Sequence, residues 1–283
     1  MTMRSATLVS TEQLARRLDD PDWILFDCRF TLTRPEAGRQ AYAAAHIPGA
    51  RYAHLDADLS APVLPASGRH PLPDPAILGE KLGRWGVSQD VQVVVYDDSF
   101  GSMAVRLWWL LRWLGHENVG LLDGGLHKWQ REKRLLTADA PTIVPARFEA
   151  RPNADLCADA AEVSAAIRRG EAVLDARPEE RFIGFVEPLD KVAGHIPGAM
   201  NRPFEDNLDL DGTLLGADAL RTAYLEALGA TPPQRSIHMC GSGVSACHNL
   251  LAMEIAGLSG ARLYPGSWSE WITDPSRPTI KED

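Results

Sequence analysis

The sequence predicts an α/β fold built as a tandem duplication, in which each copy is a small parallel sheet flanked by helices. Three blocks recur in the same order in the two halves: "WILFDCR" and "AVLDAR" at 23–29 and 172–177, "HIPGA" at 46–50 and 195–199, and "LLDGGLHKW" and "LYPGSWSEW" at 121–129 and 263–271. Chance poorly explains an identical pentapeptide in register with two other blocks. Repeats of this kind indicate one structural unit used twice.

The first half shows the alternation of elements that supports this fold class. A helix is expected after Ser10 or Thr11 as N-cap, followed by a strand at 23–27, a β-branched strand at 91–97 and an apolar helix at 105–115. Near-continuous Val and Ile runs between helices are typical of a parallel sheet covered on both faces. Each half is therefore expected to be a small open α/β domain.

Length and composition are those of two globular domains. The chain has 283 residues, of which 45% are hydrophobic and 24% charged, and a typical domain has about 150 residues. Prolines recur and helical spacing fades between the halves. We therefore expect an N-terminal domain over 1–140, a linker over 141–156 and a C-terminal domain over 157–283.

The "HIPGA" blocks are interpreted as turns that lead into strands. Gly49 and Gly198 each follow a proline, which suits a turn that needs a positive φ. This structural interpretation is preferred over a catalytic one for both blocks.

Charge and hydropathy argue against nucleic acid and membranes as partners. The formal net charge is −9 and no basic stripe is present, whereas nucleic-acid binding depends on cations that contact phosphates. The longest apolar stretch, 105–115, is interrupted by Arg106 and Arg112 and is too short to span a bilayer. It is predicted to be a core helix whose two arginines reach toward solvent.

Cysteine and histidine usage predicts a protein of a reducing compartment without cofactor or metal. Four cysteines are too few for a disulfide framework, and no C-x-x-C pair is present. Histidine spacing indicates no metal site, and no glycine-rich phosphate loop follows a strand. Residues 1–20 lack the apolar core of a signal peptide and mix acids with arginines, so a cytoplasmic location is expected. Cys28, Cys157 and Cys247 are interpreted as packing residues.

The most informative stretch is "SIHMCGSGVSACHNLLAMEIAG" at 236–257. Cys240 ends a predicted strand at the edge where open α/β sheets bind ligands, and the first half has Asp97 or Asp98 at the matching place. The small residues up to Ala246 allow backbone N–H groups to curl toward the sulfur at a helix N-terminus, which makes an anion site. Such a site lowers a cysteine pKa from about 8.5 to roughly 3.5–7.5, so Cys240 is expected to be largely ionised near neutral pH.

One position separates two chemistries for this thiolate. Cysteine phosphatases use C-x5-R, in which the arginine clamps phosphoryl oxygens, but the sixth residue after Cys240 is Ala246. A loop of this size without the arginine suits a terminal persulfide, whose outer sulfur carries the negative charge. Phosphatase activity is kept as an alternative.

These blocks and this loop resemble the two-domain rhodanese-like sulfurtransferases over essentially the whole chain. Within that family, loops reading C-G-S-G-V-[ST]-A mark the 3-mercaptopyruvate sulfurtransferases, so "CGSGVSA" favours that donor. The resemblance implies that Cys240 accepts the sulfur and passes it to a thiol or cyanide. It also implies that the loop binds the donor through Gly241, Gly243, Val244, Ser245 and Ala246.

The resemblance further implies a proton relay of Ser242, His70 and Asp56, the last two in "RYAHLDADLSAPVLPASGRHPLP". Such a relay would move a proton between the substrate thiol or enolate and the enzyme. His46 and His54 are less favoured alternatives to His70. A loop role for His70 and a solvated helix-cap role for Asp56 stay open.

Arg181 matches an arginine that the family directs toward the substrate carboxylate, where a guanidinium binds with paired N–H donors. Members of the mercaptopyruvate subgroup have a second arginine shortly after Glu-Pro. This chain reads "EPLDKVAGHIPG", with Leu189 and Asp190 at that place and Lys191 as the only nearby cation. Thiosulfate is therefore kept as the alternative donor, and a non-catalytic persulfide relay as the alternative from another functional class.

Overall fold

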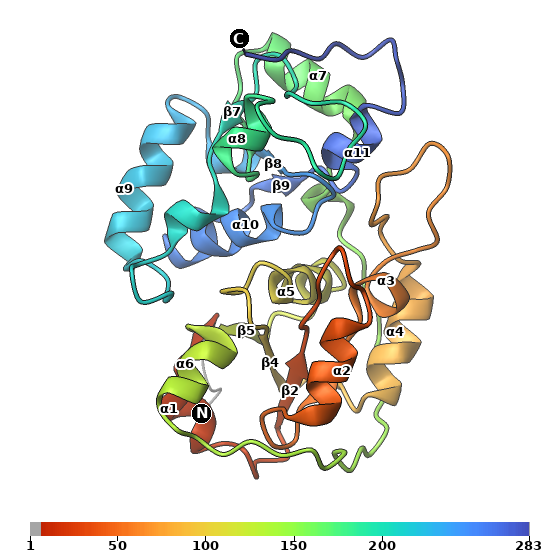
Figure 1. The fold of residues 1–283 in the computed structure, drawn as a ribbon, viewed down its shortest axis with the longest axis vertical. Helices are drawn as coiled ribbons and strands as arrows, with labels where there is room; N and C mark the ends of the chain where they lie inside the picture. Colours follow the sequence, from red (N-terminus) through yellow and green to blue (C-terminus); the bar gives the residue numbers. More distant parts are fainter. Residues whose placement is uncertain (1–6, 283) are drawn as a thin grey trace. The chain divides into compact units, whose positions relative to one another are not determined.

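A computed structural model describes residues 7–282 (Figure 1). The chain divides into two compact units that exchange segments. The first comprises the described residues up to 61 together with 73–153 and 210–213, and the second comprises 62–72, 154–209 and the described residues from 214 onward. Residues 62–72, here called the arm, come from the first repeat but belong to the second unit. The sequence does not predict this exchange.

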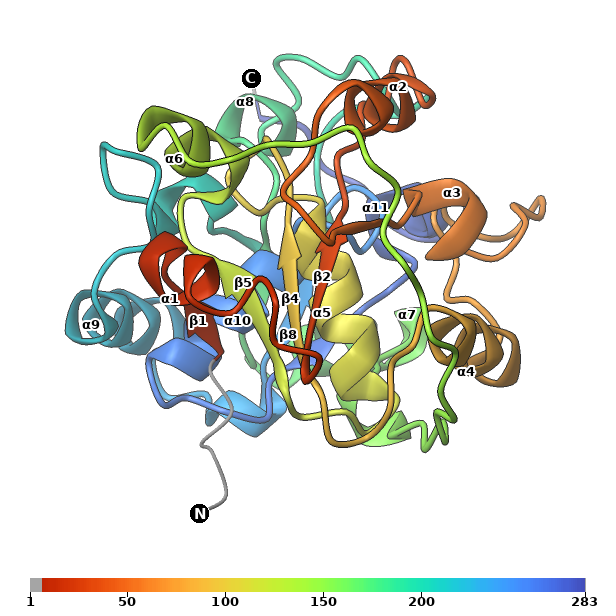
Figure 2. The same cartoon turned by 90° about the horizontal axis from the view of Figure 1, so that it is seen from below.

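The first unit is built on a five-stranded parallel sheet in the order β1-β5-β4-β2-β3. Its strands are β1 (Leu8–Val9), β2 (Trp23–Asp27), β3 (Arg51–Tyr52), β4 (Gln92–Tyr96) and β5 (Val119–Leu122). Its helices are α1 (Thr11–Ala15), α2 (Ala37–Ala44), α3 (Leu55–Asp58), α4 (Pro75–Arg84), α5 (Ala104–Trp113) and α6 (Gly125–Arg131). Figure 2 shows β2, β4 and β5 side by side, with α5 packed against β4 and β5.

The second unit repeats this plan with a four-stranded parallel sheet in the order β7-β6-β8-β9. Its strands are β6 (Val173–Asp175), β7 (Met200–Asn201), β8 (Ile237–Met239) and β9 (Arg262–Leu263). Its α-helices are α7 (Ala160–Arg168), α8 (Glu179–Phe182), α9 (Ala217–Leu228), α10 (Ala246–Ile255) and α11 (Ser267–Trp271), and 3-10 turns lie at Ala154–Leu156, Phe204–Asn207 and Pro233–Arg235. The predicted parallel α/β fold is confirmed in both units.

The duplication extends to buried ion pairs. Arg29 binds Asp27 at 2.7 Å and Arg177 binds Asp175 at 2.8 Å, and all four side chains are shielded from solvent. Each arginine also donates to the carbonyl just before its "HIPGA" histidine, at 2.7 and 2.8 Å. A buried charge is tolerated where it is paired and hydrogen-bonded, so each pair joins the end of a central strand to the following turn.

Both "HIPGA" turns have the predicted backbone. Gly49 and Gly198 have φ of +80° and +88°, which confirms the need for glycine. Residues His46 and His195 form matching antiparallel bridges. Each Nδ1 lies within hydrogen-bond distance of a backbone carbonyl oxygen, at 2.7 Å for His46 and 2.9 Å for His195. This geometry supports the structural interpretation of the blocks.

Two details of the first unit refine the sequence interpretation. Ser10 is the N-cap of α1, because its Oγ accepts from Gln13 N at 3.1 Å. The predicted apolar helix is α5, but Arg106 on it is completely buried, so the expectation that it reaches solvent is wrong. Arg112 is partly exposed and ion-paired with Glu117 at 3.0 Å.

Within 7–282, no helix has the length and apolar character needed to cross a bilayer.

Candidate active site

Cys240 follows the last residue of β8 and begins the loop that leads into α10. Met239 pairs with Asp175 in the sheet just as Tyr96 pairs with Asp27 in the first unit. The Cys240 carbonyl accepts an amide bond at 3.0 Å from the second residue of α11, and the Asp97 carbonyl accepts one at 2.9 Å from the second residue of α6. These contacts make Asp97, and not Asp98, the counterpart of Cys240.

The loop after Asp97 shows what this backbone arrangement can hold. The Asp97 carboxylate accepts four backbone N–H groups, each at 2.8 Å, from Ser99, Gly101, Met103 and Ala104. A carboxylate with several backbone donors is strongly stabilised as an anion. The first unit thus fills its loop with its own negative charge.

The loop after Cys240 depends on glycine at Gly243. This residue has φ of +72°, and a Cβ atom placed on it would lie 2.3 Å from the Pro265 carbonyl oxygen, so no other residue fits without movement of the backbone. The Cys240 amide donates to Ser267 Oγ at 3.1 Å, and the Cys240 residue is 2% exposed. Both the amide and the carbonyl of Cys240 are therefore held by α11.

The structure brings two members of the predicted relay together. His70 Nδ1 lies 2.8 Å from Ser242 Oγ, and these residues are 4% and 5% exposed, so the hydrogen bond is shielded from water. His70 reaches Ser242 because the arm belongs to the second unit. In Figure 1 the arm is the orange loop beside α11, where the Arg69 amide donates to Ser269 Oγ at 3.0 Å.

The remaining relay candidates lie in the first unit. Asp56 is on α3, and its role in the relay stays a prediction. His54 is the N-cap of α3: its Nδ1 accepts from the amides of Asp56 and Ala57 at 3.1 and 3.2 Å. His54 thus has a structural task of its own.

Arg181 lies at the C-terminal end of α8 inside a cluster of buried charges. Its Nη2 donates to Glu187 at 2.8 Å and to Asp190 at 3.1 Å. Burial alone would raise the pKa of Glu187, but the hydrogen bonds from Arg181 and from the amides of Leu189 and Asp190 outweigh it, and the pKa is lowered. Glu187 is therefore an ionised carboxylate that fixes the guanidinium of Arg181.

A second guanidinium lies beside Gly241, and the sequence reasoning missed it. Arg69, directly before His70 in the arm, forms an ion pair with Asp190 through Nη1. A Cβ atom placed on Gly241 would lie 2.8 Å from Arg69 Nη2 and 3.4 Å from Arg181 Nη1. "SGRHPLP" carries no local signal for this role, because the partners of Arg69 are more than a hundred residues away along the chain.

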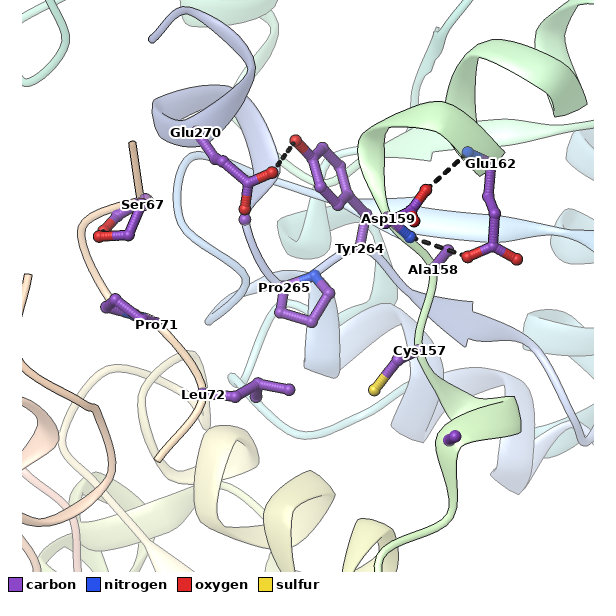
Figure 3. A pocket seen from close by; sticks show the side chains of 13 residues that line it. Ser67, Pro71, Leu72, Cys157, Ala158, Asp159, Glu162, Tyr264, Pro265 and Glu270 are labelled. Carbon is purple, nitrogen blue, oxygen red and sulfur yellow. Dashed lines mark hydrogen bonds between the residues drawn. The ribbon is translucent and has the colours of Figure 1, made fainter. Parts of the chain in front are cut away.

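A separate cavity of about 380 Å³ lies in the second unit. Figure 3 shows Cys157 and Leu72 on one side of it and the hydrogen-bonded pair of Tyr264 and Glu270 on another. Its lining does not include Cys240.

Across the described part of the chain, no group of three or more His, Cys, Asp or Glu side chains is arranged to hold a metal ion.

Two other cysteines are packed in the cores. Cys247 is in the first turn of α10, fully buried, with its sulfur 3.5 Å from the Gly243 carbonyl oxygen. Cys28 is buried at the end of β2, where burial and the nearby carboxylates of Asp27 and Asp97 raise its thiol pKa. Cys28 is therefore a neutral thiol at physiological pH.

Comparison with known families decides the classification. The family model for the rhodanese-like domain matches this sequence twice, over residues 10–132 and 159–274, once in each repeat. This chain belongs to the rhodanese-like family.

The relatives of this rhodanese-like protein are named after two different sulfur donors. It is 50% identical to a probable 3-mercaptopyruvate sulfurtransferase of Pseudomonas aeruginosa, over 99% of this chain and all of that one. It is 39% identical to a putative thiosulfate sulfurtransferase of Mycobacterium tuberculosis, over 98% of each chain. Among solved structures, the 3-mercaptopyruvate sulfurtransferase of Escherichia coli matches with a TM-score of 0.80 and 34% identity, over 93% of this chain and 99% of that one.

Proposed function

We propose that this rhodanese-like protein is a sulfurtransferase that moves a sulfane sulfur from 3-mercaptopyruvate to a thiol or cyanide acceptor through a persulfide on Cys240. The observation that carries the proposal is the buried hydrogen bond between His70 and Ser242, two residues from the nucleophile. A hydroxyl coupled to an imidazole can move a proton at the donor. The name of the 50% identical relative supports the same donor.

In the first step the Cys240 thiolate attacks the sulfur of 3-mercaptopyruvate. A sulfur–sulfur bond forms, the sulfur–carbon bond breaks, and the electron pair leaves on carbon as the enolate of pyruvate. The proton of the substrate thiol ends on that carbon and gives pyruvate, with Ser242 and His70 as the route. The sulfur is oxidised to the sulfane level while the carbon is reduced, so no further oxidant is needed.

In the second step a thiolate or cyanide attacks the outer sulfur, and the Cys240 thiolate leaves. The N–H groups of the loop from Gly241 to Ala246 would hold the negative charge of the persulfide, as the matching loop holds the Asp97 carboxylate. This chemistry needs no cofactor or metal ion. We include a cytoplasmic location in the proposal, because all four cysteines are free thiols, as is typical of proteins in a reducing compartment.

Mass spectrometry of the intact protein tests the proposal. Incubation with 3-mercaptopyruvate is expected to add one sulfur atom to the wild-type chain and to Cys247→Ser, and none to Cys240→Ser. Cyanide should then remove the added sulfur as thiocyanate. Failure of both 3-mercaptopyruvate and thiosulfate to add sulfur would favour a relay module that receives its persulfide from another protein.

Thiosulfate is the second candidate donor, because a 39% identical relative bears that name. The ratio of kcat/KM for the two donors, with cyanide as acceptor, separates the candidates. A higher value for 3-mercaptopyruvate is expected. A strong preference for thiosulfate would contradict the donor assignment and leave the persulfide mechanism intact.

A further inference from the structure

We propose that Arg69 is a specificity-determining residue, whose guanidinium binds the donor carboxylate together with that of Arg181 beside Gly241. This inference rests on the proposed function, because it names the partner of the carboxylate in 3-mercaptopyruvate. In this inference Arg69, which lies in the arm, replaces the second arginine that the mercaptopyruvate subgroup has shortly after Glu-Pro. This chain has no arginine between Pro188 and Arg202.

Each of the two guanidinium groups has one nitrogen near Gly241 that binds nothing in the described chain. Asp190 accepts from Arg69 Nη1 and from Arg181 Nη2. Arg69 Nη2 and Arg181 Nη1 have no hydrogen-bond acceptor in the part of the chain that the structure describes, and they would lie 2.8 and 3.4 Å from a Cβ atom placed on Gly241, with the bound Arg181 Nη2 at 3.5 Å. Asp190 therefore orients both groups and leaves one N–H edge of each for an incoming anion.

Gly241 lets the Arg69 guanidinium approach the loop closely. A Cβ atom there would lie 2.8 Å from Arg69 Nη2, so a side chain at this position would push the guanidinium away from the loop. Gly241 is also next to Cys240 along the chain. A carboxylate bound to the two guanidinium groups would therefore place the sulfur of a short molecule such as 3-mercaptopyruvate close to Cys240.

The position of Arg69 is well fixed. Its amide is bound to Ser269, and the next residue, His70, is bound to Ser242. The Arg69 side chain is 27% exposed and that of Arg181 is 15% exposed, so their hydrogen bonds to an anion would be only partly screened by water. The Nε of Arg69 is buried and has no hydrogen-bond partner in the described chain. The protein itself therefore does not satisfy all the donors of this guanidinium.

The charge balance agrees with a substrate site. Arg69, Arg177 and Arg181 carry three positive charges, and Asp175, Glu187 and Asp190 carry three negative ones. The cluster is therefore neutral without ligand, and an added carboxylate would gain hydrogen bonds without the need to displace Asp190. Lys191 is exposed and offers only a hydrated point charge, which is a poorer match for a carboxylate.

Steady-state kinetics with two donors test the inference. The donors are 3-mercaptopyruvate and mercaptoacetone, which has the same thiol and ketone but no carboxylate. Arg69→Ala is expected to raise KM for 3-mercaptopyruvate about 10- to 100-fold, because one charged hydrogen bond to the substrate is lost. The change in kcat should be small. For mercaptoacetone, kcat/KM should stay within about threefold of wild type, which also shows that the variant is folded.

Two further variants complete the test. Lys191→Ala should keep the wild-type KM, and Arg69→Lys should fall between wild type and Arg69→Ala because it keeps the charge but loses the paired donors. Equal losses on both donors in Arg69→Ala, or a KM defect in Lys191→Ala and none in Arg69→Ala, would overturn the inference. A wild-type chain that takes no sulfur from 3-mercaptopyruvate would instead refute the proposed function.

Discussion

The loop after β4 and the loop after β8 occupy the same place in the two repeats, but they begin with different side chains. In the first unit the Asp97 carboxylate takes four backbone N–H groups. In the second unit Cys240 stands at the matching position. The difference teaches that the fold supplies the same loop position in both halves, and that in the first half a side chain of the loop itself binds the N–H groups; under the proposed function, the second half uses this position for Cys240 and its persulfide.

The serines of the two loops differ in the same way. Ser99, two residues after Asp97, accepts a hydrogen bond from Ser102 within its own loop at 3.0 Å. Ser242, two residues after Cys240, binds His70 of the arm. The first loop is satisfied by its own residues, whereas the second takes a partner from a distant part of the sequence.

The largest expected effect comes from copying the first loop into the second. Cys240→Asp should lower sulfur transfer roughly 10⁴-fold or more, because the nucleophile is lost. It should unfold at no lower urea concentration than Cys240→Ser, because the loop N–H groups can bind the new carboxylate. A Cys240→Asp protein much less stable than Cys240→Ser would contradict the equivalence of the two loops.

The converse change removes the resident anion of the first loop. Asp97→Ala leaves four N–H groups without their acceptor and should lower the free energy of unfolding by about 4 kcal/mol. Urea unfolding measures this effect. The matched control is Asp98→Ala: burial and the charge of Asp97 raise the pKa of Asp98, so loss of Asp98 should cost little or nothing. Similar losses for the two variants would argue against a special role of Asp97.

The contact with the arm should matter for chemistry more than for stability. Ser242→Ala and His70→Ala are each expected to lower kcat with 3-mercaptopyruvate roughly 10²-fold, the usual contribution of positioned proton transfer. Because the two groups would act as a unit, the double variant should lose little more than either single one. Fully multiplicative losses would show that the residues act independently.

The smallest effect concerns the glycine that shapes the second loop. Gly170 and Gly243 have φ of +70° and +72°, but a Cβ atom on Gly170 meets nothing within 4 Å while one on Gly243 meets the Pro265 carbonyl. Gly170→Ala should cost about 1 kcal/mol of unfolding free energy, and Gly243→Ala about 2 kcal/mol or more. Equal costs in thermal or urea unfolding would mean that the loop relaxes around the new methyl group.

Local patterns were sufficient to predict the fold, and they gave Cys240 as the candidate nucleophile. Strand and helix periodicity gave the parallel sheets, and the register of the repeated blocks placed Cys240 beside either Asp97 or Asp98. Only the strand pairing decides for Asp97, because a shift of one residue leaves the sequence pattern unchanged. The turn glycines, Gly49 and Gly198, were predictable since the need for positive φ is a property of the turn itself.

Long-range contacts were less accessible from the sequence. His70 was named through a family resemblance, whereas Arg69 next to it was overlooked although it lies over the same loop. Its partner Asp190 is 121 positions away, and neither the sequence around Arg69 nor the sequence around Asp190 indicates the pairing. The burial of Arg106 was missed for the same reason, since hydropathy patterns describe an element and not what covers it.

The transfer of the arm to the second unit has a consequence for how this gene can be divided. A fragment that starts at residue 154 would keep the cysteine and its loop but would lack Arg69 and His70. Such a fragment would have no imidazole at Ser242, and supplying the first half as a separate polypeptide should restore it only if the two pieces reassociate. Deleting the half that has no cysteine at its own loop would therefore also remove side chains that contact the loop of its copy.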